Sequence, residues 1–362
     1  MSKSTNQKNE DKIEKKGKFT NMIKNKKIIM FATALLLVII GVITFVLITV
    51  LSNPVVITIN GTKYNKTDYM IYLRLAKTNL FDENTTDLPE ATLNTIADKT
   101  TNITVENYLR GKVEESIKVA GAIESMAKEN NISLNDEQLE KLENDKKKYV
   151  SNLGGKKKFN EFLKNNRTTE KAYDKMAKVD ALYKEVFNLL YAEGKKYDLT
   201  EDEKNQIEKE YYQSYSKIKQ IVLYTVDTST KEPLSNSVVE QKKLLAETIR
   251  NMITDVNEFD SYIKKYSDDA INVEPPYDMY FTSNQVLKEI EDNVAVMKEG
   301  QISKVFKSTY AYHIVLKEKL DDGYLKTLYN NKREEKFLKA ISDKIDDSVI
   351  IMENEFTKVK IK

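Results

Sequence analysis

The sequence predicts an α+β protein of two or three domains, held to a membrane by an N-terminal transmembrane helix. Three observations lead to this prediction. An uncharged apolar run follows the N-terminal tail, apolar residues recur at helical spacing through the first half of the chain, and strand-like β-branched runs begin near Ile218. The 362 residues are enough for domains with cores of their own.

The composition favours long, polar-faced helices over a turn-rich β-sandwich, because charged residues make up 31% of the chain while Gly and Pro number 10 and 5. The net charge is +2, yet residues 1–27 carry nine lysines against three acidic residues, a net +6. The basic excess therefore belongs to the tail and does not indicate a nucleic-acid surface. The absence of Cys excludes disulfides, thiolate metal sites and a lipoprotein anchor. With one His we expect no metal and no cofactor.

The membrane anchor is predicted at Ile28–Leu51, a run of 24 residues without a charge. As a helix this run would be about 36 Å long, enough to cross a bilayer core. A cleaved signal peptide would have a shorter apolar core and a small-residue cleavage site, which Leu51-Ser52-Asn53-Pro54 does not supply. The basic tail, residues 1–27, is expected in the cytoplasm by the positive-inside rule, so that residues 52–362 lie outside the cell membrane.

Residues 52–215 are expected to form a helical domain that opens with a β-hairpin. The β-branched run Val55–Ile59 ends in Asn60-Gly61, a strong turn signal. The apolar stripes that follow are ordinarily explained by core packing. Helices are expected at 67–75, 105–130, 135–153, 159–163, 168–191 and 200–217. Two of them begin at capping boxes, formed by Asn135 with Gln138 and by Thr200 with Glu203.

Residues 216–320 are expected to form an α+β module in the order β-α-α-β-α-β-β. Its last strand contains His313, the only histidine of the chain. A lone histidine in a strand is more often a hydrogen-bonded core residue than a catalyst. Strands are expected at 221–226, 277–281, 305–309 and 312–317, and helices at 237–253, at 259–266 and around Val286 and Ile290.

Four segments of this module, in this order, resemble the signatures of a parvulin peptidyl-prolyl isomerase domain: Lys219-Gln220-Ile221-Val222-Leu223, Phe259 to Asp269, Met297-Lys298-Glu299-Gly300-Gln301-Ile302-Ser303 and Tyr310-Ala311-Tyr312-His313-Ile314-Val315. The helical region before it resembles the N-terminal chaperone domain of the PrsA, SurA and PpiD foldases. The resemblance implies an α+β fold in which a SurA-N-like helical domain carries an inserted parvulin-like domain. It also implies that residues 321–362, a helix followed by a strand-like segment, return to complete the chaperone domain.

The resemblance also implies site residues. Catalytic positions fall on His313, Asp269 and Gln220, and substrate-binding positions on Val286, Ile290, Ala295, Phe281 and Tyr310. The sequence departs from the family pattern, because Gln220 stands where a histidine is usual, Ala311 replaces a glycine, and the loop at Pro275-Pro276 has no glycine.

The function implied is that of a membrane-anchored extracytoplasmic foldase. It would assist unfolded or partly folded exported proteins that contain X-Pro bonds, and it would isomerise those bonds. The alternative is a non-catalytic chaperone or binding protein that keeps an inactive parvulin fold. We expect clients to bind aromatic surface on the helical domain, which carries Tyr69, Tyr72, Phe162 and Tyr173. A purely structural protein would need a repeat or a coiled-coil seam, which the sequence lacks. The oligomeric state stays open.

Overall fold

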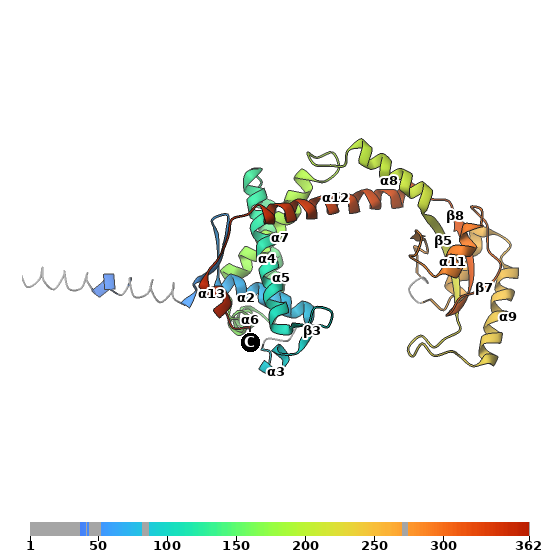
Figure 1. The fold of residues 1–362 in the computed structure, drawn as a ribbon, viewed down its shortest axis with the longest axis horizontal. Helices are drawn as coiled ribbons and strands as arrows, with labels where there is room; N and C mark the ends of the chain where they lie inside the picture. The colour runs from blue at the N-terminus through green and yellow to red at the C-terminus, as the bar shows by residue number, and fades with distance from the viewer. Residues whose placement is uncertain (1–36, 41, 43–51, 82–86, 270–273, 362) are drawn as a thin grey trace, which may run out of the picture. The chain divides into compact units, whose positions relative to one another are not determined.

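The protein has a mixed α+β fold. The computed structural model describes residues 37–40, 42, 52–81, 87–269 and 274–361 (Figure 1). Its contacts divide the chain into two compact units, Met1–Val186 with Ala340–Lys362, and Phe187–Lys339. The C-terminal segment therefore belongs with the N-terminal unit. The second unit also contains residues 187–215 and 321–339, which the sequence analysis assigned to the helical domain.

The predicted anchor and tail lie almost wholly outside the described residues. Of the run Ile28–Leu51, only residues 37–40 and 42 are described, and these are helical and exposed. Among the residues that the structure describes, no helix has the length and apolar character needed to cross a membrane.

A three-stranded antiparallel sheet joins the two ends of the first unit. Its order is β2-β1-β9, with β1 at Val55–Ile59, β2 at Thr62–Asn65 and β9 at Ile350–Met352. The predicted hairpin turn is confirmed, since Asn60 and Gly61 both have positive φ, at 48° and 84°. The Asn60 N–H donates to the Val349 carbonyl at 3.0 Å, which extends the pairing with the C-terminal segment. This segment, expected to be strand-like throughout, instead turns after β9 into helix α13, Asn354–Lys358.

Helices build the rest of the first unit. The elements are α2 (Lys66–Leu80), α3 (Glu90–Leu93), β3 (Ile96–Asp98), β4 (Ile103–Thr104), α4 (Val105–Glu129), α5 (Asp136–Asn152), α6 (Lys156–Asn165) and α7 (Glu170–Leu190). The core face of α4 contains Leu109, Val113 and Ile117, none of them exposed to solvent. Gly121, on the same helix, faces the side chain of Ile59, so closely that an added Cβ would lie 2.7 Å from Ile59 Cγ2. Helix α5 starts at the predicted capping box.

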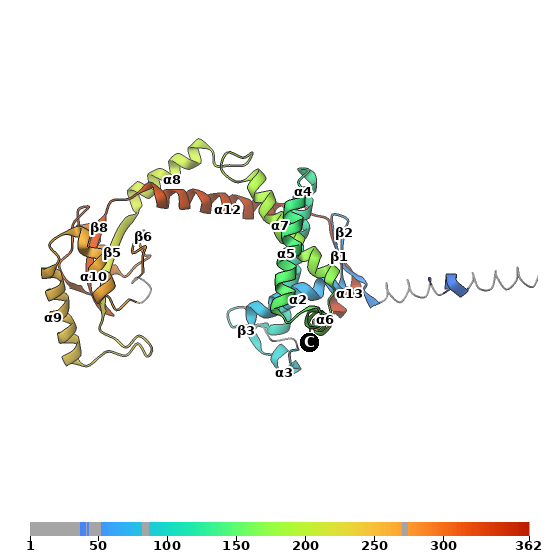
Figure 2. The ribbon, with the colours of Figure 1, turned by 180° about the vertical axis from the view of Figure 1, so that it is seen from behind.

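The second unit contains a four-stranded antiparallel sheet of order β6-β5-β8-β7, and Figure 2 labels its strands β5, β6 and β8. Its elements are α8 (Glu201–Ser214), β5 (Ser216–Tyr224), α9 (Asn236–Met252), η1 (Val256–Glu258), α10 (Phe259–Tyr266), β6 (Met279–Phe281), α11 (Lys288–Ala295), β7 (Phe306–Lys307), β8 (Ala311–Glu318) and α12 (Asp322–Asp346). Helix α8 ends earlier than predicted and β5 begins earlier, because Ser216–Ile218 pair with β6.

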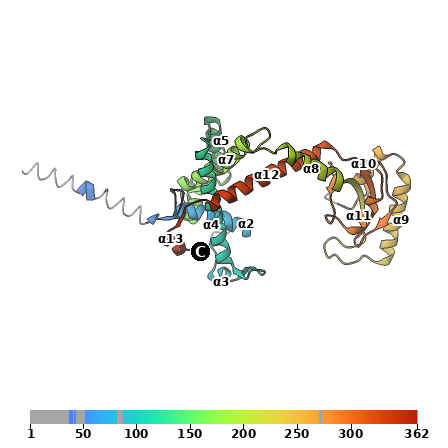
Figure 3. The ribbon, with the colours of Figure 1, turned by 45° about the horizontal axis from the view of Figure 1, so that its top comes forward.

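Within this unit α8 and α12 lie side by side (Figure 3). The buried Arg333 of α12 binds the loop just before α8 through its Nε, which lies 2.7 Å from Asp198 Oδ1. Burial by itself raises the pKa of Asp198, but the hydrogen bonds from Arg333 and two backbone N–H groups outweigh it and lower the pKa to about 2. Lys336 Nζ forms a second ion pair, 2.9 Å from Glu203 Oε2.

Candidate active site

The two faces of the second unit's sheet carry different cores. Strands β5 and β8 pair over their whole common length, from Lys217 opposite Glu318 to Tyr224 opposite Ala311. Because side chains alternate along a strand, Ile221 and Ile314 belong to the face covered by α9 and α10. The opposite face carries its own apolar cluster: Ile218, Phe281, Ile290, Val294, Met297 and Val315. His313 shares this second face with Val315, two residues further along β8.

Both nitrogens of His313 have partners. Nε2 lies 2.8 Å from Ser308 Oγ, and Nδ1 lies 3.2 Å from Gln220 Oε1 on the neighbouring strand. The register places Val222 opposite His313 on β5 and Phe306 opposite it on β7. The Phe306 ring stacks on the imidazole, with centroids 5.2 Å apart and planes inclined by 17°. The imidazole is therefore fixed by strands on both sides.

The imidazole is neutral at physiological pH. His313 is 4% exposed, and this burial lowers its pKa to about 4. The negative charges of Glu289 and Asp269 act in the opposite direction, but their effect is smaller than that of desolvation. An uncharged ring cannot act as a cationic electrophile, so its role near pH 7 is to donate and accept hydrogen bonds.

Asp269 reaches the site because the segment after α10 binds the edge of β5. The Val222 N–H donates to Ser267 Oγ at 3.1 Å, and the Asp268 N–H donates to the Val222 carbonyl at 2.7 Å. Asp269, the next residue, is partly exposed, and its negative charge acts to raise the pKa of His313. Of the three positions predicted as catalytic, His313 and Gln220 are in direct contact, and Asp269 acts on the imidazole through its charge.

The predicted substrate-binding positions separate into two groups. Ile290 and Phe281, each 5% exposed, belong to the apolar cluster, and Val286 packs against it from just before α11. Ala295 is exposed and lies outside the cluster, because helical spacing places Ile290 and Val294 on the buried face, and Ala295 is turned about 100° from Val294. Tyr310, 45% exposed, lies in the turn before β8.

Three residues near His313 were not predicted from the sequence. Ser308 and Phe306 come from β7 and the turn after it, and Glu289 comes from α11. The register of β7 on β8 places Phe306 opposite His313. This register is set by the turn at residues 308–311, where the Ser308 N–H donates to the Ala311 carbonyl. No strong turn signal in the sequence predicts that hydrogen bond. In the part of the chain that is described, no group of three or more His, Cys, Asp or Glu side chains could hold a metal ion.

The aromatic residues expected to bind clients are less accessible than predicted. Tyr69 and Tyr72 are 0% and 6% exposed, so they belong to the core of the first unit. Phe162 and Tyr173 are partly buried and both pack against Tyr149. Phe162 and Tyr173 stabilise the unit through these ring contacts, and Tyr69 does so through an edge contact with Phe356.

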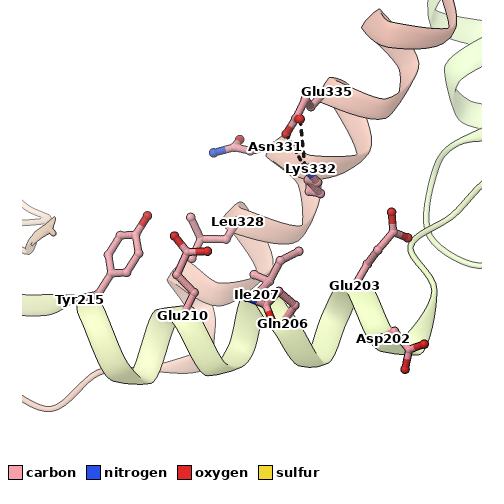
Figure 4. Close-up of a pocket in the computed structure, with 10 residues that line it drawn as sticks. All are labelled: Asp202, Glu203, Gln206, Ile207, Glu210, Tyr215, Leu328, Asn331, Lys332 and Glu335. Carbon is pink, nitrogen blue, oxygen red and sulfur yellow. Dashed lines mark hydrogen bonds and ion pairs between the residues drawn. The ribbon is translucent and has the colours of Figure 1, made fainter.

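A hollow lies between α8 and α12, away from His313, and we call it the acidic groove (Figure 4). Its volume is about 520 Å³, and Ile207, Leu328 and Tyr215 supply apolar surface. Polar groups surround this surface: Asp202, Glu203, Gln206, Glu210, Asn331, Lys332 and Glu335. Four carboxylates against one lysine make the lining acidic, so the groove suits an extended segment that carries apolar and basic side chains.

Part of the second unit matches a known protein family. Residues 226–319 match the rotamase family, described as the PPIC-type PPIASE domain; this match includes His313 and Asp269 but begins after Gln220. The foldase protein PrsA of Staphylococcus epidermidis is 26% identical over 258 residues, which cover 66% of this chain and 73% of the relative. PrsA of Staphylococcus aureus strain Newman is 26% identical over 270 residues, or 72% and 75% of the two chains.

Among solved structures, the foldase protein PrsA from Streptococcus pneumoniae overlaps 71% of this chain and 94% of its own, with 14% identity and a TM-score of 0.35. The domain match and the relatives show that the chain carries a PPIC-type peptidyl-prolyl isomerase domain and is similar to foldases of the PrsA type.

Proposed function

We propose that this protein is a membrane-anchored extracytoplasmic foldase that isomerises X-Pro bonds in exported proteins. The observation that carries the proposal is the arrangement around His313, where a neutral imidazole lies on the same sheet face as an apolar cluster, within a domain matched to PPIC-type isomerases. A proline ring needs apolar contact, and the peptide carbonyls beside it need polar groups. This face of the sheet carries both apolar side chains and hydrogen-bonding groups.

The reaction is a rotation and needs no covalent step. The barrier to rotation about a peptide bond is about 18–20 kcal/mol, and spontaneous X-Pro isomerisation takes tens to hundreds of seconds. Each tenfold acceleration needs about 1.4 kcal/mol of preferential binding to the twisted state. In this proposal Val286 and Ile290 contact the pyrrolidine ring, His313 forms the polar wall, and Asp269 lies near the substrate carbonyl.

The isomerase proposal is tested with a matched pair of valines. The intact protein should accelerate cis-to-trans conversion of a proline peptide in a protease-coupled assay. Val286→Asp places a charge beside the apolar cluster and should remove most of the acceleration, at least tenfold. Val256→Asp makes the same change in η1, where the side chain is 41% exposed, and should have little effect. A wild-type rate equal to the spontaneous rate, or equal losses in the two variants, would contradict the proposal.

We also propose the domain organisation expected from the sequence, in which residues 52–215 and 321–362 form the chaperone part and residues 216–320 the isomerase part. Pairing of β9 with β1 supports the return of the C-terminal end to the N-terminal part.

The proposed membrane anchoring rests on the uncharged run Ile28–Leu51, which follows the basic tail. Protease added to intact spheroplasts should degrade all but the anchor and tail. Recovery of a protected full-length chain, or of a soluble secreted form, would refute the anchoring.

The acidic groove favours a second candidate, a non-catalytic chaperone that holds extended segments of its clients. In that case the protein suppresses aggregation of an unfolded client without accelerating proline isomerisation. Ile207→Glu would add a charge to the apolar surface of the groove and should abolish suppression. Leu244→Glu, on α9 where the side chain is 65% exposed, is the matched control. Full suppression by the Ile207 variant would exclude the groove as the client site.

A further inference from the structure

The hydrogen bonds around His313 define which nitrogen carries the proton. Gln220 presents its carbonyl oxygen, Oε1, to Nδ1 at 3.2 Å, and a carbonyl oxygen can only accept. Nδ1 must therefore be the donor. In a neutral imidazole the other nitrogen, Nε2, is then an acceptor, and the Ser308 hydroxyl 2.8 Å away must donate to it.

Ser308 is itself arranged to donate in this direction. Its Oγ accepts the backbone N–H groups of Tyr310 and Ala311, each at 3.3 Å. With these acceptor positions used, the hydroxyl hydrogen can point to His313 Nε2 at 2.8 Å or to the Ala311 carbonyl at 3.4 Å. The shorter distance favours the imidazole. Ser308 is 4% exposed, so water does not compete freely for the hydroxyl.

We propose that Gln220 is a positioning residue that holds His313 in the neutral tautomer protonated on Nδ1, with Ser308 closing the chain of hydrogen bonds at Nε2. The imidazole is thereby a fixed wall of the substrate site, and because it is buried it stays uncharged between pH 5 and 8. Its consequence for catalysis rests on the isomerase function proposed above. The tautomer itself does not depend on that function.

The surroundings of the ring agree with this role on every side. β5 presents Gln220 and Val222, neither of which titrates, and β7 presents the Phe306 ring. The charged groups that act on the imidazole are two carboxylates, Glu289 on α11 and Asp269 after α10. Their combined attraction for a proton is smaller than the cost of desolvating an imidazolium, so the buried ring stays neutral.

The inference can be tested by NMR on the intact chain, because His313 is the only histidine. Protein labelled with ¹⁵N-histidine, and purified without a histidine tag, gives one imidazole. Long-range ¹H–¹⁵N correlation spectra then show directly which nitrogen is protonated and at what pH the second proton binds. We expect the Nδ1–H tautomer as the single form from pH 8 down to pH 5.

Variants of Gln220 separate positioning from packing. Gln220→Leu removes the acceptor and should release the tautomer to a mixture. Gln220→Glu keeps an acceptor at Nδ1 but adds a negative charge, which should raise the pKa of His313 by about 1 to 3. Gln241→Glu makes the same change on an exposed position of α9, across the sheet, and should leave the pKa of His313 unchanged.

The inference is overturned if the wild-type ring is protonated on Nε2, if it titrates near pH 6.5, or if Gln220→Leu keeps a pure Nδ1–H form. A protease-free fluorescent-peptide assay supplies the catalytic readout. Wild-type isomerase activity should be independent of pH from 5 to 8, and Gln220→Glu activity should follow the new pKa of His313. No isomerase activity together with the expected spectra would refute the proposed function and leave the tautomer assignment standing.

Discussion

Acid should destabilise the second unit through His313. In the unfolded chain the imidazole binds a proton near pH 6.5, whereas in the folded protein burial lowers its pKa to about 4. Below pH 6.5 the unfolded state therefore holds more protons than the folded state. The free energy of unfolding decreases as the pH is lowered, until the pKa of the folded state is reached. For these two pKa values the loss between pH 8 and pH 5 is about 2 kcal/mol. Because the ring is only 4% exposed, solvent screening does not cancel this loss of stability.

The perturbation that isolates this term is His313→Gln, which keeps hydrogen-bonding groups but cannot titrate in this range. Hydrogen exchange of the β5 and β8 amides, corrected for intrinsic rates, gives the free energy of opening this sheet at pH 8 and pH 5. The wild-type protein should lose about 2 kcal/mol more than the variant on acidification. Carboxylates titrate in both proteins, so their contribution cancels. The same pH dependence in wild type and variant would refute the burial argument.

Three further predictions concern stability. Gly121→Ala should destabilise the first unit by about 1–3 kcal/mol, because the new Cβ meets the core side chain of Ile59. Gly111→Ala, on the same helix but with open space around it, should be neutral or stabilise by up to about 1 kcal/mol. Thermal melts in which the Gly111 variant is the less stable of the two would contradict this. Arg333→Ala should cost about 1.5–3 kcal/mol in urea unfolding, because the charge-assisted hydrogen bond of a buried guanidinium to Asp198 is lost, whereas Lys288→Ala, from an exposed ion pair, should cost less than about 1 kcal/mol; equal costs would count against burial of the guanidinium as the cause. Deletion of residues 348–362 removes β9 from β1 and should lower the melting temperature of the first unit; an unchanged melt would show that the pairing is dispensable.

The local features of the fold could be predicted from the sequence. Asn60-Gly61 gives a turn and Thr200 with Glu203 gives a capping box, because each depends on residues within one turn of chain. The start of β5 could not be found in this way. The charged helical pattern of α8 continues through Lys217, but Ser216–Ile218 take the strand conformation because they pair with β6, more than 60 residues later in the chain.

The same distinction applies to the site. The family resemblance led to His313, Gln220 and Asp269, which lie on recognisable segments; the structure places the first two in contact and the charge of the third near the imidazole. Ser308 was missed because its contact depends on the dihedral angles of a short turn. Ala295 was expected in the pocket, but the helix begins at Lys288, and its phase puts Val294 on the buried face. A shift of one residue in a helix turns a side chain by about 100°, which no composition argument can detect.

Both proposed activities can be measured on one preparation of the intact protein, wild type and His313→Ala, with circular dichroism as the control for folding. The account predicts that the variant loses at least tenfold in proline isomerisation, about 1.4 kcal/mol of transition-state stabilisation, while it still suppresses aggregation of an unfolded client. Isomerase activity equal to that of the wild type would show that the active site does not lie at His313, and loss of aggregation suppression in a folded variant would show that the chaperone function has been placed in the wrong domain.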